Sequence, residues 1–118
     1  MKLSIDQEGQ SPVAVSVAGD ITQRHVSPFV EPLGDALCED GYEKPVMLNL
    51  QQVDMLDSSG VGWLLVCHKR FHEKGGKLVL HSFSPTVSNV LKVLNMQKVL
   101  NLAETENDAR RMFEGDAS

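Results

Sequence analysis

The sequence predicts a single α/β domain built on a mixed β-sheet. Short strand-like runs alternate with segments whose apolar residues recur at helical spacing. Two strands close together at the start predict an antiparallel hairpin, and later strands separated by helices predict parallel pairing through right-handed crossovers. The expected order is ββαβαβαβα, with about four helices. At 118 residues the chain supports one core, so we expect one domain over 1–118, with its core at about 3–113 and a frayed tail at 114–118.

The first half of the chain contains the hairpin and an irregular first helix. Residues 3–5 and 13–17 alternate apolar and polar side chains, and Gly9-Gln10-Ser11-Pro12 between them is a turn sequence. Ser27-Pro28 precedes an apolar stripe, but Pro32 cannot lie deep inside a helix. We therefore expect regular helix from about Pro32 to Glu39.

The second half predicts three strands and three helices. The apolar run Val46–Leu50 is typical of a buried central strand. A helix from about Ser59 to Glu73 should end at Gly75-Gly76, and Ser84-Pro85 should open another. The remaining expectations are a strand at Leu78–Leu80, core positions at Leu91, Leu94 and Met96, and a short edge strand at Val99-Leu100. A last helix, capped by Thr105, should carry Ala109, Met112 and Phe113.

Composition and charge exclude several classes of protein. Lys and Arg are scattered in a chain of net charge −5, so direct contact with nucleic acid is not expected. No apolar run approaches the roughly 20 residues that span a bilayer. The start, Met1–Asp6, does not resemble a signal peptide, so we expect a cytoplasmic protein without a membrane segment.

The cysteines and histidines do not predict a metal site. Cys38 and Cys67 lack metal-ligand spacing and are interpreted as reduced packing thiols. His68 and His72 have the i, i+4 spacing that can hold a metal, but His68 shares a face with apolar residues. It is interpreted as a histidine at the edge of the core, and no metal or cofactor is assigned.

The most informative segment is Asp57-Ser58-Ser59-Gly60-Val61-Gly62, which follows the predicted central strand. Asp or Ser before an apolar helix is ordinary N-cap chemistry, and capping alone could explain the hydroxyls. Two glycines in a first helical turn are harder to explain, because each weakens a helix by about 1 kcal/mol relative to Ala. Their missing side chains would let another molecule's backbone, or a phosphate, approach closely.

Two other interpretations of this helix start remain open. Gly60–Leu65 partly matches a dinucleotide-binding fingerprint, although Leu65 stands where the third small residue belongs. Trp63 points away from the apolar stripe and is expected to be partly exposed. It either packs under a neighbouring helix or forms an aromatic contact beside the serines.

The serine segment resembles the phosphorylatable loop of the STAS domain family, in particular of the anti-sigma factor antagonists. It matches the family's D-S-S-G-[apolar]-G signature at every position. The glycines before Leu78, the helix opening at Ser84-Pro85 and the corner Val17–Ile21 also fall in family register, so the resemblance covers about residues 3 to 113. The family's corner usually has an acidic residue where this chain has Thr22, which points to a different kinase pairing.

The resemblance implies a switch rather than an enzyme. Such antagonists bind an anti-sigma factor, usually one with serine-kinase activity, and so release a sigma factor; the kinase then phosphorylates one loop serine. By position Ser58 is the acceptor, with Ser59 as the alternative. Other residues implied in the loop or in partner contact are Asp20, Ile21, Thr22, Asp57, Gly60, Gly62 and Trp63. The alternatives are a stressosome-like scaffold, the small cytoplasmic subunit of a lipid transporter and a small nucleotide-binding protein. A weak homodimer is also left open.

Overall fold

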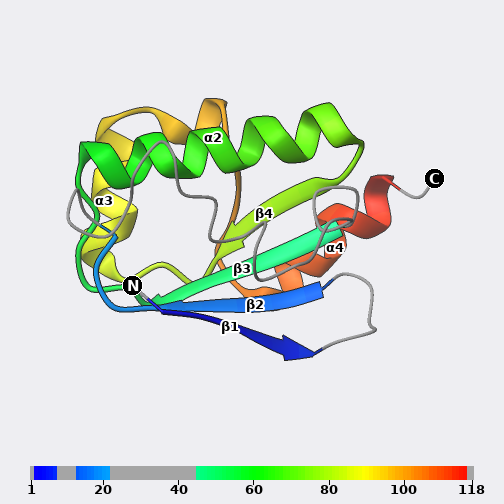
Figure 1. The fold of residues 1–118 in the computed structure, drawn as a ribbon, viewed down its shortest axis with the longest axis horizontal. Helices are drawn as coiled ribbons and strands as arrows, with labels where there is room; N and C mark the ends of the chain where they lie inside the picture. Colours follow the sequence, from blue (N-terminus) through cyan, green and yellow to red (C-terminus); the bar gives the residue numbers. More distant parts are fainter. Residues whose placement is uncertain (1, 8–12, 22–44, 117–118) are drawn as a thin grey trace.

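A computed structural model describes residues 2–7, 13–21 and 45–116 of the chain (Figure 1). The expected first helix, Thr22 and Cys38 lie outside these residues. The elements are β1 (Lys2–Gln7), β2 (Val13–Ala18), β3 (Pro45–Gln52), α2 (Ser58–Lys74), β4 (Lys77–His81), α3 (Pro85–Val93), the 3₁₀ turn η2 (Met96–Lys98), β5 (Asn101–Ala103) and α4 (Glu106–Asp116).

The described strands form one mixed sheet in the order β1-β2-β3-β4-β5. β1 runs antiparallel to β2, whereas β2, β3, β4 and β5 are parallel to one another. The register places Val15, Leu48, Leu80 and Leu102 side by side across the four parallel strands. The predicted combination of an antiparallel start and parallel crossovers is confirmed.

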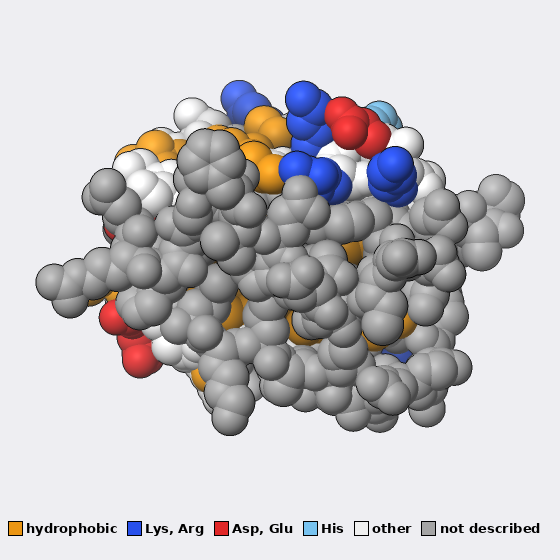
Figure 2. Space-filling model, viewed as in Figure 1, with side chains coloured by type: hydrophobic (Ala, Val, Ile, Leu, Met, Phe, Trp, Pro, Cys, Tyr) orange, Lys and Arg blue, Asp and Glu red, His pale blue; other side chains and the backbone are white. Residues whose placement is uncertain are grey.

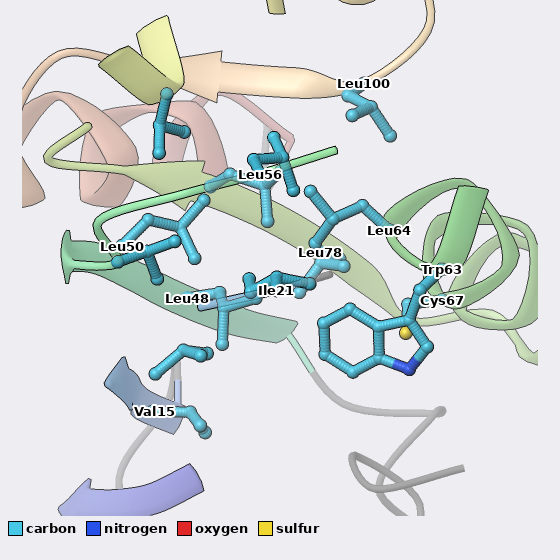
Figure 3. Close-up of a cluster of buried hydrophobic side chains, with 14 of the residues drawn as sticks. Val15, Ile21, Leu48, Leu50, Leu56, Trp63, Leu64, Cys67, Leu78 and Leu100 are labelled. Atoms are coloured by element: carbon cyan, nitrogen blue, oxygen red, sulfur yellow. The ribbon is translucent and has the colours of Figure 1, made fainter. Parts of the chain in front are cut away.

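Helices cover both faces of the sheet, which explains why β3 is apolar on both sides. Leu48 and Leu50 pack into the larger core cluster, which also contains Leu64 of α2 and Val87 of α3 (Figure 3). Met47 points the other way, into a smaller cluster with Ala109 of α4. A strand buried on both faces is expected at the centre of a parallel sheet.

The predicted helix ends are formed by the residues that the sequence suggested. Gly75 ends α2 in the left-handed conformation (φ 87°), and the Gly76 N–H donates to the Phe71 carbonyl at 2.9 Å. Ser84 caps α3, and the Thr105 hydroxyl accepts from the Asp108 N–H at 3.1 Å at the start of α4. These caps determine the residues at which the three helices begin or end.

Three details of the C-terminal half differ from the prediction. The edge strand is Asn101–Ala103 rather than Val99-Leu100, because η2 intervenes and leaves Val99 50% exposed. Leu94 is 42% exposed rather than buried, since α3 ends before it and Asn95, at φ 57°, turns the chain away. Met96 is partly buried against the larger cluster.

Helix α4 continues to Asp116, beyond the start of the expected tail. Its Ala109 is fully buried, and Met112 and Phe113 pack against the smaller cluster, as predicted. Within the described residues, no helix is both long enough and apolar enough to cross a bilayer.

Candidate functional site

The chain beyond β2 lies directly against the chain beyond β3. The Gly19 N–H donates to the Gln52 carbonyl at 3.0 Å, and the Ile21 N–H donates to the Met55 carbonyl at 2.9 Å. Gly19 has φ 88°, a conformation that glycine adopts without strain. The result is a parallel bridge between Ile21 and Leu56. The Gly19–Ile21 corner and the serine loop are therefore neighbours at the carboxyl edge of the sheet.

Asp57, not a serine, caps helix α2. Its backbone is extended, and its Oδ1 accepts a hydrogen bond from the Gly60 N–H at 2.9 Å. The first intrahelical bond runs from the Val61 N–H to the Asp57 carbonyl at 3.0 Å. Helix α2 thus begins one residue earlier than predicted, with Ser58 and Ser59 as its first two residues. The start of α2 is therefore capped as the sequence suggested, but by the Asp57 carboxylate rather than by a serine hydroxyl.

The two serine side chains are exposed at this helix end. Within the described part of the chain, neither hydroxyl has a hydrogen-bond partner. The Ser58 and Ser59 N–H groups lie before the first intrahelical bond, where the helix dipole favours negative charge. The described part of the site thus presents two hydroxyls without hydrogen-bond partners beside a positive helix end.

The two glycines of the first turn have opposite surroundings. Gly60 is buried, and a Cβ there would overlap the Ile21 carbonyl oxygen and lie 2.7 Å from Leu56 Cδ1. Its missing side chain admits this chain's own strand extension, which explains the glycine from within the fold. Around Gly62, apart from its chain neighbours and the nearby backbone of α2 itself, no atom of the described residues lies within 4 Å of the Cβ position.

Trp63 packs inside the domain. It is only 6% exposed and belongs to the larger core cluster, where its indole lies close to Cys67 (Figure 3). The expected partial exposure is wrong, and the alternative of packing under neighbouring elements is confirmed. The indole therefore offers little surface to a partner, although it lies only five residues from Ser58.

Acidic and basic side chains separate along α2. Asp20 and Asp57 are half-buried and Asp54 is exposed, all near the serine end. At the other end, His72 and Lys74 occupy the last turn and exposed Lys69 forms an i, i+4 ion pair with Glu73. Lys and Arg side chains gather over the outer side of this helix in Figure 2. Among the described residues, the three charged side chains named near the serine end are therefore acidic.

His68 is half-buried on α2, as the sequence suggested for a histidine at the edge of the core. Burial lowers its pKa from the ordinary value, and the neighbouring His72 charge lowers that pKa further. Both effects favour the neutral form of the His68 ring.

Met55 is an exposed residue of the site that sequence reasoning missed. It is 54% exposed and lies between the exposed Asp54 and the buried Leu56. The Met55 carbonyl accepts a hydrogen bond from the Ile21 N–H. This bond fixes the Met55 backbone although the side chain faces solvent. The sequence feature that could have identified Met55 is an apolar side chain between acidic residues of a predicted loop.

The sequence model of the STAS domain family matches residues 4–109 of this chain. The chain belongs to the STAS domain family. A relative of this STAS domain is the anti-sigma F factor antagonist of Paenibacillus polymyxa, 25% identical over 109 residues, which cover 92% of this chain and 93% of the relative.

Solved structures share the fold of this STAS domain. An anti-sigma factor antagonist from Mycobacterium paratuberculosis superposes with a TM-score of 0.72 at 19% identity, covering 94% of this chain and 92% of the other. The anti-sigma factor antagonist SpoIIAA, in its unphosphorylated form, gives a TM-score of 0.68 at 20% identity and covers 97% of both chains.

Proposed function

We propose that this STAS domain is an anti-sigma factor antagonist controlled by serine phosphorylation. It binds an anti-sigma factor with serine-kinase activity and so releases a sigma factor. Phosphorylation of Ser58, with Ser59 as the alternative acceptor, ends the interaction. The protein acts in the cytoplasm by binding, without catalytic activity of its own. The observation that carries the proposal is a pair of exposed serine hydroxyls, without hydrogen-bond partners among the described residues, at a helix end that Asp57 already caps.

The site can accept a phosphate without loss of the fold. A phosphoserine adds about −1.5 to −2 charges at neutral pH, and a helix N-terminus tolerates negative charge. The cap does not depend on either serine, because the Gly60 N–H is bound to Asp57. The bonds from Ile21 to Met55 and from Asp57 to Ile21 hold the loop independently of the hydroxyls.

The same phosphate would weaken a protein interface centred on the loop. Asp57, Asp20 and Asp54 already place negative charge around the serines. A phosphate adds like-charge repulsion, bulk and a desolvation cost, and about 3 kcal/mol of such terms lowers affinity by about 100-fold. Partner release without unfolding is the expected consequence.

The comparisons support the partner class. The curated relative is an antagonist of an anti-sigma factor, and the solved relative SpoIIAA was described in an unphosphorylated form. The nucleotide-binding alternative is less well supported, because Gly60 faces the Ile21 carbonyl rather than a ligand.

Phosphopeptide mapping tests the proposal. The purified protein is incubated with ATP, magnesium and a lysate of the source cells, beside matched Ser58→Ala and Ser59→Ala variants. We expect one phosphate on Ser58 that is absent from the Ser58→Ala variant, and loss of a co-purifying kinase from the phosphorylated form. No phosphate, together with unchanged binding partners for Ser58→Ala, would instead favour the scaffold or transporter-subunit alternatives.

A further inference from the structure

Gly62 has no explanation in the packing of the described residues, unlike Gly60. A Cβ at Gly60 would collide with Ile21, whereas a Cβ at Gly62 would meet no described atom within 4 Å apart from its chain neighbours and the backbone of its own helix. Glycine in the interior of a helix weakens it relative to alanine. Among the described residues, no contact from outside α2 therefore accounts for the glycine at position 62.

Helix geometry places Gly62 directly over the serines. It is four residues after Ser58 and three after Ser59, so all three share one face of α2. Helical side chains lean toward the N-terminus, and each covers the surface of the turn before it. A side chain at position 62 would therefore extend over the exposed hydroxyls of Ser58 and Ser59.

We propose that Gly62 determines access to the phosphoacceptor serines: its bare backbone is where the anti-sigma kinase packs against α2 when a serine enters the kinase active site. This inference rests on the proposed function and adds the contact position. Val66, one turn farther along and 42% exposed, provides apolar surface at the edge of this contact. Gly62 is a specificity-determining residue, not a catalytic one.

Opposite effects on stability and on phosphorylation distinguish this role from a structural one. Gly62→Ala and Gly62→Leu are compared with His72→Ala, an exposed position at the far end of the same helix. We expect Gly62→Ala to raise the urea midpoint of unfolding and yet slow phosphorylation. Gly62→Leu should slow it by about 10- to 100-fold, as expected when a reacting group is held about 1 Å out of place. His72→Ala should leave the phosphorylation rate unchanged.

A second measurement needs no kinase. In a Ser58→Cys background, the rate of labelling by a maleimide reagent is measured with Gly62 intact and with Gly62→Leu, and mass spectrometry reads only the peptide that contains position 58. We expect Gly62→Leu to slow labelling severalfold and His72→Ala to leave it unchanged.

The outcomes separate the two proposals. If the wild type gains no phosphate, the proposed function fails, and the labelling rates decide whether Gly62 controls access. If the wild type is phosphorylated and Gly62→Leu is phosphorylated at the same rate, the inference is overturned while the proposed function stands. A lower urea midpoint for Gly62→Ala would also overturn it, because the glycine would then be a packing requirement.

Discussion

Helices α2 and α3 begin on the same side of the sheet with similar polar residues, yet they use them differently. At the start of α3, the Ser84 hydroxyl accepts from the Val87 N–H at 3.3 Å and donates to the Val53 carbonyl at 3.1 Å. At the start of α2, Asp57 performs the capping and leaves the next two serines unpaired among the described residues. The start of α3 thus uses its serine hydroxyl in structural hydrogen bonds, whereas the start of α2 leaves its serine hydroxyls exposed.

The third residue after each cap extends this contrast. In α3 it is Val87, fully buried in the larger core cluster. In α2 it is Gly60, because the Ile21 carbonyl occupies the space that a side chain would fill. The start of α2 is thus held by backbone contact with a neighbouring strand. Exposed serines on a tightly held helix end are what the proposed phosphorylation requires, because the charge would then change while the fold stays the same.

Gly60→Ala should give the largest loss of stability. The added methyl group overlaps the Ile21 carbonyl and approaches Leu56, so the corner must separate from the loop. Overpacking of this kind costs typically 1–3 kcal/mol and sometimes more, and contact with rigid backbone favours about 3 kcal/mol. Urea unfolding followed by Trp63 fluorescence measures it, with Gly62→Ala as the matched control. Equal stability of the two variants would show that the close contact with Ile21 is not maintained in solution.

Ser84→Ala tests the structural hydroxyl. The variant removes the cap of α3 and leaves the Val53 carbonyl without its donor, which should cost about 1–2 kcal/mol of the free energy of unfolding. Ser84→Thr retains a hydroxyl at the same position and should recover most of the loss. If Ser84→Ala were as stable as the wild type, the contrast between the two helix starts would disappear.

Asp57→Ala tests the side-chain cap of α2, which is made by Asp57 and not by Ser58 or Ser59. Loss of the bond to the Gly60 N–H should cost about 1 kcal/mol of the free energy of unfolding, and Asp57→Asn should retain most of it. Chemical denaturation of both variants measures the effect. A loss as large in Asp57→Asn as in Asp57→Ala would show that the negative charge, rather than the hydrogen bond, stabilises the helix start.

Local patterns predicted the helix ends and strands of the second half, because caps, glycines and apolar periodicity act over a few residues. Gly75, Ser84 and Thr105 are examples in which the chemistry of one residue decides where a helix starts or stops. The predicted position of the edge strand was wrong because Asn95 takes a left-handed conformation, which the local sequence pattern did not indicate.

The candidate site was only partly predictable for a different reason. The serines, Asp57 and the glycines could be selected from spacing, but the roles of Gly60 and Trp63 depend on contacts made across the fold. Gly60 meets Ile21, almost forty positions earlier in the chain, and Trp63 is buried in a core that several elements build. Such contacts leave no periodic signal.

The two helices should also differ in their response to acid, because α2 contains His68 and α3 contains no histidine. Burial and the His72 charge lower the pKa of His68 in the folded protein, so the unfolded chain binds a proton first as the pH falls. Stability should therefore fall below about pH 6.5 until the folded-state pKa is passed. Urea unfolding from pH 7.5 to pH 5 should show a smaller slope for His68→Gln than for the wild type. Identical slopes would show that His68 is not desolvated.

The smallest effects on stability should come from Ser58→Ala and Ser59→Ala, the counterparts of Ser84→Ala. Both side chains are exposed and neither caps the helix, so the free energy of unfolding should stay within about 0.5 kcal/mol of the wild type. Ser58→Ala should nevertheless abolish phosphate incorporation, whereas the matched Ser59→Ala variant should retain it. A loss of about 1 kcal/mol or more for Ser58→Ala would mean that its hydroxyl supports the fold after all. The phosphate would then disturb the domain itself as well as its interface. A stability change near zero, combined with loss of the phosphate, would show that α2 separates capping from signalling between adjacent residues.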